Sequence, residues 1–480
     1  MNILLVDVPS RKLKGIYGIP IGLLYVGGAI ERCGHSPKII DLYSTGEGAF
    51  GLKNFNYRCL DKIIEEFKPS IIGFGGIATS YGRTKHLSIH IKCKYPNIIQ
   101  IAGGALSSVY DLLLSKTKVD VVFHGEIEAN LPIFLKRIGE SRSFNDIDGI
   151  SYVINEKIIR NPPVKQIENL DVIPFPAYHL INIPEYSSIE RLEKGKKHIA
   201  IISSRGCTSR CSFCYRQVRG YRRHSVDYVM EHIKFLKEKY NITSFLFSDE
   251  LFNANRQWVL DFCDKLGKNN LDIVFEIGGA RVDKVDNEML MKLKETGCVA
   301  IGYGQESGSD IILKELRKGT TVQQNKEITN LTKNMGFISE VQLVVGSPSE
   351  TTKTIYETIK FLKDIDSYTY SLNYLIPLPE APIWKYVEEN NLVRDVEEYL
   401  DFVAEHGGAA AINLTKQPHI IWHSWNLYIR FELKSHYYKK TNQKKKYLFY
   451  RIMIIFLPLI FIVSCLIPNN LKDILYNKLI

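Results

Sequence analysis

The stretch Ser204-Arg-Gly-Cys207-Thr-Ser-Arg-Cys211-Ser-Phe-Cys214-Tyr215 places three cysteines in one short loop with the spacing C-x3-C-x2-C. Thiolates are soft ligands that favour zinc or an iron–sulfur cluster. A four-iron cluster takes four ligands, so three cysteines would leave one iron open to a substrate or cofactor, which favours catalysis over electron storage. A zinc site would need a fourth Cys or His close by, and the nearest candidate is His224. Three ordinary buried thiols are the remaining interpretation.

Composition indicates a globular protein of more than one domain. The 480 residues are 45% hydrophobic and 24% charged, with a formal net charge of +10. This length is enough for two or three domains with large cores. No basic groove interleaved with aromatic residues is apparent, so nucleic acid is not expected as a partner. The basic residues gather in three clusters: Lys194, Lys196 and Lys197; Arg216, Arg219, Arg222 and Arg223; and Lys439, Lys440, Lys444, Lys445 and Lys446.

The other six cysteines are scattered along the chain and do not form a disulfide framework, which favours buried thiols in a reducing compartment. The N-terminal residues 1–7 predict a strand and lack the charged region of a signal peptide. We therefore expect the bulk of the protein in the cytoplasm. The scattered cysteines are Cys33, Cys59, Cys93, Cys263, Cys298 and Cys465.

Residues 1–140 alternate short apolar strands with amphipathic helices, a pattern that predicts a parallel, doubly wound Rossmann-like sheet. Parallel strands bring their exits to one edge of the sheet, where such folds bind ligands. Three exits contain glycine, which lets the backbone approach a large ligand closely. No G-x-G-x-x-G opens a helix after the first strand, which disfavours an ordinary dinucleotide site. The exits are Gly75-Gly76, Gly103-Gly104 and Gly125.

Residues 141–195 are predicted to be a connector, with a hairpin around Asn155 and a proline-rich stretch after it. Residues 196–400 again alternate strands with helices, and six βα units predict a partial (β/α)6 barrel of the TIM type. The cysteine loop follows the first strand of this barrel. Polar residues follow the later strands, at the ends where such barrels carry their chemistry.

Residues 401–480 are predicted to be a helical region with an apolar segment at 447–467. At ~1.5 Å per residue this segment approaches the ~30 Å of a bilayer core. Arg451 and Pro458 interrupt it, so a bilayer span and a buried or re-entrant helix are both open. Lysines before the segment favour a cytoplasmic N-terminal side. We expect a cytoplasmic protein, peripheral to the membrane or anchored at its cytoplasmic face through this segment.

The cysteine spacing and the strand exits after it resemble the radical S-adenosylmethionine (SAM) superfamily, and the N-terminal region resembles its cobalamin-binding subgroup. The resemblance covers roughly residues 1–390. It implies that Cys207, Cys211 and Cys214 ligate a catalytic [4Fe–4S] cluster, whose open iron is chelated by SAM. It also implies that Phe213 shields the cluster and that the backbone of Tyr215 lies near the adenine.

The same resemblance assigns SAM contacts to later strand exits. Asp249 and Glu250 stand where the family often has Gly-Gly-Glu, which implies an acceptor for the SAM ammonium group; a helix N-cap pair is the alternative. Arg281 could meet the SAM carboxylate or form a structural ion pair, and Glu306 would bind the ribose. Gly346 opens a turn that resembles the subgroup's Gly-x-Pro-Gly-Glu-Thr, with Ser349 in place of the second glycine.

The first domain resembles the cobalamin-binding subgroup in the loops at its strand exits. The D-x-H-x-x-G signature of a histidine ligand is absent, so cobalamin is expected to bind without a protein histidine on cobalt. His35 and His124 are then loop or helix-end residues. A vestigial first domain without cobalamin is the alternative. The implied cobalamin contacts are Gly75, Thr79, Ser80, Gly103, Gly104, Gly125 and Glu126.

The function that this resemblance implies is cobalamin-dependent radical SAM catalysis. Reductive cleavage of SAM would give a 5′-deoxyadenosyl radical that activates a substrate C–H bond, with methyl transfer to carbon as the leading interpretation. Cyclisation, rearrangement or oxidation with cobalamin is the alternative within the family. A membrane-linked iron–sulfur redox or sensor protein without SAM cleavage is the alternative of another class. A small-molecule or lipid-like substrate and a one-electron reductant of the flavodoxin or ferredoxin type would be the partners.

Overall fold

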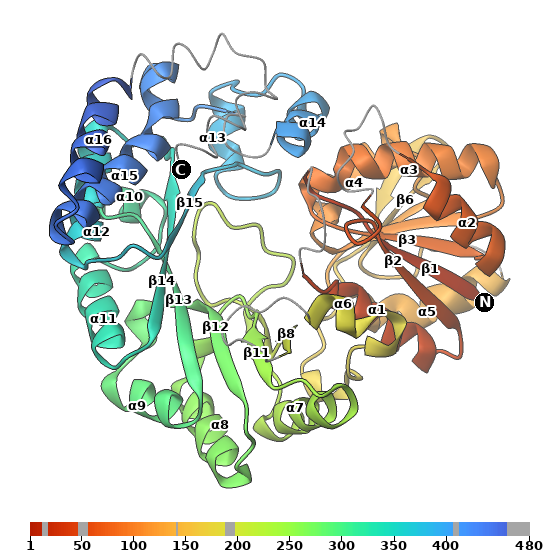
Figure 1. The fold of residues 1–480 in the computed structure, drawn as a ribbon. Helices are drawn as coiled ribbons and strands as arrows, with labels where there is room; N and C mark the ends of the chain where they lie inside the picture. Colours follow the sequence, from red (N-terminus) through yellow and green to blue (C-terminus); the bar gives the residue numbers. More distant parts are fainter. Residues whose placement is uncertain (12–17, 47–55, 141–142, 188–196, 407–411, 458–480) are drawn as a thin grey trace.

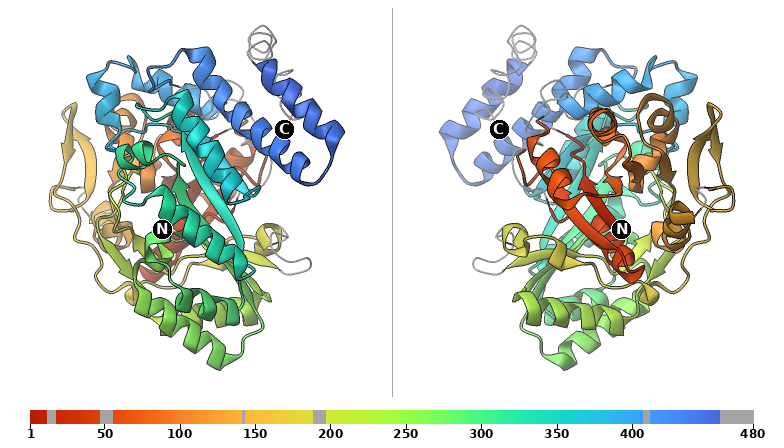
Figure 2. Two further views of the ribbon diagram at one scale, coloured as in Figure 1. Left: turned by 90° about the vertical axis from the view of Figure 1, so that its left-hand side faces the viewer. Right: turned by 90° about the vertical axis from the view of Figure 1, so that its right-hand side faces the viewer.

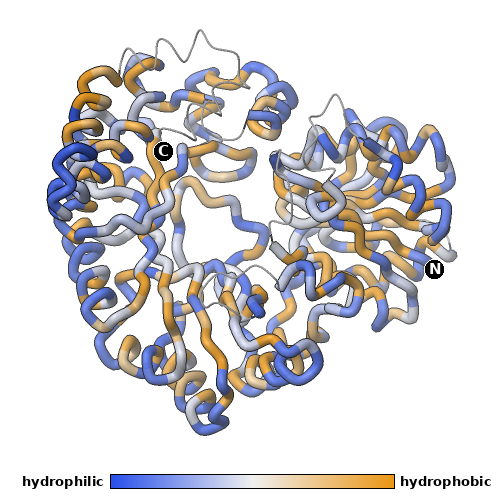
Figure 3. The backbone as a smooth tube through the Cα atoms, viewed as in Figure 1, coloured by the Kyte–Doolittle hydropathy of each residue, from blue (hydrophilic) through white to orange (hydrophobic). Residues whose placement is uncertain are grey.

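Two mainly parallel sheets and a helical C-terminal region make up the protein (Figure 1). The computed structural model describes residues 1–11, 18–46, 56–140, 143–187, 197–406 and 412–457. Hydrophobic residues concentrate along the strands of both sheets, and hydrophilic residues lie on the outer helices (Figure 3). The α/β fold class that the sequence predicts, a Rossmann-like domain followed by a partial barrel, is confirmed.

The first sheet has the strand order β2-β1-β3-β4-β5-β6-β7, and its first five strands are parallel. The chain moves outward in one direction to β2 and in the other to β3, so the carboxyl ends of β1 and β3 form a topological switch point. The parallel strands are β1 (Asn2–Asp7), β2 (Ser36–Asp41), β3 (Ile71–Gly75), β4 (Ile99–Gly103) and β5 (Val121–Phe123).

Alternation along β1 explains how helices cover both faces of this sheet. Ile3 and Leu5 pack with α1 (Ile21–Arg32) and α5 (Ile127–Glu140). Leu4 and Val6 pack on the opposite face, because successive side chains of a strand point to opposite sides. The helices on that second face are α2 (Arg58–Phe67), α3 (Tyr81–Lys94) and α4 (Tyr110–Lys116).

The hairpin predicted in the connector extends the first sheet. Its strands are β6 (Ile150–Ile154) and β7 (Lys157–Arg160), and β6 pairs antiparallel with β5. Asn155 and Glu156 both have positive φ, which suits the tight turn between the strands. The first sheet thus continues past residue 140, and the rest of the connector carries the short helix α6 (Ile183–Ser187).

The second sheet is an all-parallel, six-stranded partial barrel in the order β15-β14-β13-β12-β11-β8, as expected. Figure 1 shows its helices on the outer side of the curved sheet. The strands are β8 (His198–Ile201), β11 (Ser244–Phe247), β12 (Val274–Ala280), β13 (Cys298–Glu306), β14 (Ile338–Val345) and β15 (Tyr370–Tyr374). The helices are α7 (Val226–Tyr240), α8 (Arg256–Asn269), α9 (Asn287–Glu295), α10 (Asp310–Glu315), α11 (Val322–Asn334) and α12 (Thr352–Asp364).

Two short helices after the barrel pack against the first domain. They are α13 (Trp384–Glu389) and α14 (Val396–His406), and their apolar side chains share a core with strands and helices of the first sheet. Tyr81 of α3 donates a hydrogen bond to Glu397 at 3.1 Å, which adds a polar contact across the same interface. The chain therefore returns to its first domain after completing the barrel.

The C-terminal helices α15 (His419–Lys440) and α16 (Lys444–Ile455) form an antiparallel pair beside the barrel. Trp422 and Trp425 of α15 are buried against β14, β15 and α12. No helix in the described part of the chain is long and apolar enough to cross a membrane. The apolar segment predicted at 447–467 is described only as far as Leu457, and the remainder lies outside the described residues.

We predict that Trp425→Ala destabilises the barrel edge, because it removes a fully buried side chain that α15 inserts between β14, β15 and α12. The expected loss is about 3–5 kcal/mol of unfolding free energy, measured by urea denaturation. Ile421→Ala, on the same helix but 38% exposed, is the control and should change stability little. Equal effects of the two substitutions would contradict this packing role.

Candidate functional site

The cysteine loop is framed by a small hairpin at the exit of β8. Its strands, β9 (Ser204–Gly206) and β10 (Tyr221–Arg223), are antiparallel, and the loop runs between them. The Ser212 amide donates to the Leu316 carbonyl at 2.9 Å, and the Ile383 amide donates to the Ser212 carbonyl at 2.8 Å. The loop is thus held between the end of α10 and the segment before α13.

The thiols of Cys211 and Cys214 act as a pair. A hydrogen bond from Cys214, with help from the positive charge of Lys318, lowers the pKa of Cys211. The same hydrogen bond and burial raise the pKa of Cys214. The pairing therefore favours the thiolate at one of the two cysteines, which is the form that binds metal.

The surroundings of the cysteines bear on the zinc interpretation. Among the described residues, no three His, Cys, Asp or Glu side chains converge as one metal ion would require. In a four-iron cluster each thiolate binds a different iron, so convergence on one point is not needed. His224, the possible fourth zinc ligand, instead bonds Asp171 at 3.1 Å and stacks on Tyr228 at 3.9 Å between ring centroids.

Charged side chains from later strands surround the paired thiols. Arg281 and Lys318 lie close enough to Cys211 to lower the pKa of its thiol, after the hydrogen bond from Cys214. Arg281 binds Asp283 through two hydrogen bonds of 2.8 and 2.9 Å, and its buried Nη1 has no hydrogen-bond partner among the described residues. Glu306 accepts a hydrogen bond from Lys318 at 2.9 Å. The ion pair expected as an alternative for Arg281 is therefore formed, and one of its donor groups stays unused.

Asp249 and Glu250 have different surroundings, although the sequence treats them as a pair. Asp249 is buried and accepts hydrogen bonds from the Ser203 amide at 3.0 Å, the Ser203 hydroxyl at 2.9 Å and the Ser204 hydroxyl. Burial raises the pKa of Asp249 to about 6. Asp249 thus stabilises the segment after β8 by its bonds to Ser203 and Ser204. Neither residue caps α8, whose N-cap is Asn255.

The turn after β14 forms despite Ser349. Gly346 has φ of 100°, and its amide and that of Ser347 donate to the buried Glu350 carboxylate. Ser349 donates its amide to Glu315 at 3.1 Å, so the serine is accommodated where the resemblance expects glycine. Burial raises the pKa of Glu350 to about 8, although these amides lower it.

A cavity of about 850 Å³ lies between the carboxyl edge of the first sheet and the inner wall of the barrel. Its volume is near the upper end for small-molecule sites, as a large cofactor requires. No histidine lines it among the described residues. Glu250 lines its barrel side, whereas Thr79 is buried outside the lining. The other predicted first-domain residues all line the cavity: Gly75, Ser80, Gly103, Gly104, Gly125 and Glu126.

Glycine is needed at the floor of this cavity. A Cβ on Gly75 would lie 2.6 Å from Leu23, and a Cβ on Gly76 would lie 2.6 Å from the Ser80 hydroxyl. Gly104 and Gly125 have φ of 72° and 75°, which L-residues rarely adopt. The floor is therefore open backbone that a flat, bulky ligand could approach. The Ser80 hydroxyl itself donates to the Val8 carbonyl at 2.9 Å.

A family model supplies the assignment of the barrel. Residues 201–362, from β8 to α12, match the model described as the radical SAM superfamily. Residues 201–362 are therefore a radical SAM domain. The cysteine loop, Arg281, Glu306 and Gly346 all lie within this matched region.

Similarity extends beyond the barrel. An uncharacterized methyltransferase of Pyrococcus horikoshii is 29% identical over 82% of this chain and 84% of its own length. An anaerobic magnesium-protoporphyrin IX monomethyl ester cyclase of Synechocystis is 23% identical over 86% of this chain and 81% of its own. The solved structure of OxsB, a cobalamin-dependent SAM radical enzyme with aqua-cobalamin and SAM bound, aligns with a TM-score of 0.68. The alignment covers 99% of this chain and 74% of the OxsB chain. Because the sequence identity is 16%, this match shows a shared fold.

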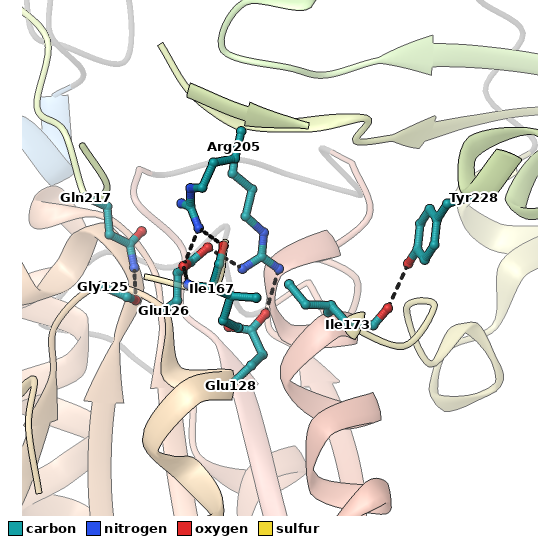
Figure 4. A network of polar contacts seen from close by, with 9 residues as sticks. Gly125, Glu126, Glu128, Ile167, Ile173, Arg205, Gln217 and Tyr228 are labelled. Carbon is teal, nitrogen blue, oxygen red and sulfur yellow. Dashed lines mark hydrogen bonds and ion pairs between the residues drawn. The ribbon is translucent and has the colours of Figure 1, made fainter. Parts of the chain in front are cut away.

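An ion-pair network ties the cysteine loop of the radical SAM domain to the first domain (Figure 4). Arg205 and Arg222 are cross-strand partners at the base of the loop, and both bond Glu126, at 3.1 and 2.7 Å. Arg205 also bonds Glu128 at 2.6 Å. The Gln217 side chain donates to the Gly125 carbonyl at 2.9 Å. Glu126, predicted to contact cobalamin, lines the cavity, but its carboxylate is bonded to Arg205 and Arg222.

Sequence reasoning missed Lys318, Arg205 and the clamp role of Arg222. The sequence shows Arg222 only as a member of a basic cluster. None of these residues belongs to a motif, because their partners lie at long sequence separation, such as Glu126 for both arginines. A second cavity of about 430 Å³ lies inside the barrel and shares Leu246 and Ser248 with the large one.

We predict that Glu126→Ala weakens the joint between the domains, since it leaves two buried guanidinium groups opposite each other. Removing one partner of a buried pair costs about 3–5 kcal/mol, measured as unfolding free energy in urea. Glu128→Ala is the matched control and should cost less than half as much, because Arg205 keeps Glu126. A larger effect at Glu128 would refute the assignment of Glu126 as the central residue.

We predict that Glu350 makes stability depend on pH. Its folded pKa of about 8 exceeds the ordinary 4.5, so its favourable contribution is complete below pH 4.5 and is lost as pH rises toward 8. Glu350→Gln keeps an acceptor for the Gly346 and Ser347 amides but does not titrate. The variant should therefore gain stability over wild type between pH 5 and 8, at up to about 1.4 kcal/mol per pH unit. Parallel pH profiles for wild type and variant, with exposed Glu388→Gln as control, would contradict this.

Proposed function

We propose that the protein is a cobalamin-dependent radical SAM enzyme that transfers a methyl group to a substrate carbon. The observation that carries the proposal is the cavity of about 850 Å³ between the glycine edge of the first sheet and the exits of the radical SAM barrel. The similarity to a methyltransferase along most of the chain, and to the OxsB fold along nearly all of it, supports this reading.

The residues that we propose to hold the cluster are Cys207, Cys211 and Cys214, with Phe213 as its apolar cover. Phe213 packs against the core that the first domain shares with α13 and α14, so it is well placed to exclude water. When bound, the cluster supplies one electron for SAM cleavage, and cobalamin supplies a methyl carrier. The chain itself orients these groups and keeps water out.

SAM would be held by side chains from several barrel exits. We propose Glu250 for the ammonium group, the unused Nη1 of Arg281 for the carboxylate, Glu306 for the ribose hydroxyls, and the Tyr215 backbone beside the adenine. Lys318 fixes the Glu306 carboxylate at 2.9 Å. Asp249 is reassigned from a direct contact to a positioning residue, since it holds Ser203 and Ser204 before the cysteine loop.

Cobalamin would lie on the open backbone of the glycine edge, at Gly75, Gly103, Gly104 and Gly125. The chain offers no histidine to cobalt in the described lining, which agrees with the absence of the D-x-H-x-x-G motif. Thr79 and Ser80 would support the loop after β3. We keep the four proposed domains: the cobalamin-binding domain at 1–140, the connector at 141–195, the radical SAM barrel at 196–400 and the helical region at 401–480. Strands β6 and β7 of the connector extend the first sheet.

A second candidate is a cobalamin-dependent cyclisation or rearrangement. The similarity to the Synechocystis cyclase, over 86% of this chain, favours it specifically. In either case we propose a small-molecule substrate and an external one-electron reductant of the flavodoxin or ferredoxin type. A lipid-like substrate and a place at the cytoplasmic face of a membrane are the finer proposals that the apolar stretch 447–467 supports.

The decisive experiment supplies anaerobically reconstituted protein with reductant, cobalamin and methyl-deuterated SAM. We expect 5′-deoxyadenosine and transfer of the deuterated methyl group to cobalamin, both measured by mass spectrometry. Cys211→Ala should abolish 5′-deoxyadenosine formation, whereas Cys298→Ala, at a buried cysteine of β13, should retain it.

Two outcomes would redirect the proposal. If 5′-deoxyadenosine forms without label on cobalamin, the cyclisation or rearrangement reading replaces methyl transfer. If the protein holds its full iron content but yields no 5′-deoxyadenosine, the redox or sensor reading replaces radical SAM catalysis.

A further inference from the structure

Helix α16 is apolar on two opposite faces. Its inner face packs on α15, where Tyr450, Met453, Ile454 and the following Leu457 meet Leu427 and Phe431. Its outer face carries five large apolar side chains that remain exposed. They are Leu448, Phe449, Ile452, Ile455 and Phe456, which follow one another at helical spacing and define the outer stripe.

The outer stripe is unusual for a surface that contacts only water. Leu448 is 58% exposed and Ile455 is 72% exposed, although both are large hydrophobic residues on a helix of 12 residues. Scattered single exposed residues need no explanation, but a contiguous apolar patch marks an interaction site. Figure 2 shows α15 and α16 at the edge of the molecule.

Lysines gather at the N-terminal end of the same helix. Lys444, Lys445 and Lys446 begin α16, and Lys439 and Lys440 end α15 one turn earlier. Lys440 pairs with Asp366. The structure gives Lys439, Lys444, Lys445 and Lys446 no acidic partner within the described residues, and Lys446 lies 5.0 Å from the Tyr438 ring centre. Positive charge therefore stays available beside the outer stripe.

We propose that the outer stripe and these lysines dock the protein on the surface of an anionic lipid membrane. An interfacial helix buries an apolar face at the headgroup boundary and presents basic residues to acidic lipids. This inference does not depend on the proposed reaction.

Charge decides between the possible occupants of this face. A second copy of the chain, with net charge +10 and the same lysines, would bring like charges together. The side chains beyond residue 457 include one acidic residue, Asp473, and two lysines, so they carry no net negative charge to balance the lysines of α16. An anionic headgroup layer satisfies both the apolar stripe and the lysines.

The membrane contact would be rigidly joined to the barrel. Trp422 and Trp425 fix α15 to β14, β15 and α12, and α16 packs on α15. Docking through α16 would therefore hold the barrel edge at β15 at a set orientation to the lipid surface, which suits an enzyme that receives an amphiphilic substrate from it.

The test is co-sedimentation of the full-length protein with vesicles. We expect binding to vesicles of phosphatidylcholine and phosphatidylglycerol in equal parts, and little binding to phosphatidylcholine alone. Leu448→Asp should weaken binding at least about tenfold, because it replaces a buried apolar contact by a charge. Ile311→Asp is the matched control, since Ile311 is also 58% exposed but lies on α10. It should bind as wild type does.

A second pair of variants tests the charge. Replacing Lys444, Lys445 and Lys446 by Gln should lower affinity for the anionic vesicles by about a hundredfold, at about 1 kcal/mol per lysine. The control replaces Lys268, Lys353 and Lys360 by Gln, which removes equal charge from exposed barrel positions. It should keep most of the binding.

Three results would overturn the proposal. The first is no binding of wild type to anionic vesicles. The second is binding that Leu448→Asp leaves unchanged while its thermal midpoint falls, which would assign the outer stripe to packing within the chain. The third is a wild-type dimer that Leu448→Asp converts to monomer without effect on vesicle binding, which would assign it to a second copy.

Discussion

The carboxylate of Glu126 holds the two halves of this protein in register. Arg205 and Arg222 are direct neighbours across the β9–β10 hairpin, and two like charges side by side in a nearly dry site need a shared counter-ion. The counter-ion comes from the loop after β5, in the other domain. Burial raises the pKa of the Glu126 carboxyl. The hydrogen bonds from Arg222 and the Ile167 amide, with the charges of Arg205 and Arg222, lower this pKa by more, so Glu126 stays ionised. The cysteine loop thereby acquires a fixed position over the glycine edge of the first sheet.

This constraint explains why one cavity serves both sheets. In parallel sheets every strand ends at the same edge, so each domain has a single edge that can carry chemistry. The Glu126 pairs bring those two edges face to face, and the cavity of about 850 Å³ is the space between them. Gln217, from the cysteine loop, closes one side of that space by its bond to the Gly125 carbonyl. Gln217 and Val218 from the cysteine loop line this cavity, so a cofactor on the glycine edge would lie beside that loop.

The sequence was informative where the signal is local. Alternation of strands and helices located both sheets to within a few residues, and glycine-containing exits located the floor of the cavity. Long-range pairings were beyond it: nothing near Glu306 indicates Lys318 as its partner, and nothing near residue 126 indicates two arginines from the β9–β10 hairpin. The β6–β7 hairpin was expected, but its pairing with β5 depends on a tertiary contact that no local pattern records. Motif resemblance also failed to separate residues that are adjacent in the chain.

Asp249 and Glu250 show why adjacency misleads. Both residues lie beyond the end of β11, and the chain bends at Glu250, so the two carboxylates have different surroundings. Asp249 is buried under the exit of β8, where three donors from Ser203 and Ser204 compensate its desolvation, and Glu250 is left on the wall of the cavity. A Gly-Gly-Glu segment would have only one carboxylate to place, and it would be the third residue. Asp249, at the position of the second glycine, thus braces the segment before the cysteine loop, and Glu250 supplies the carboxylate that lines the cavity.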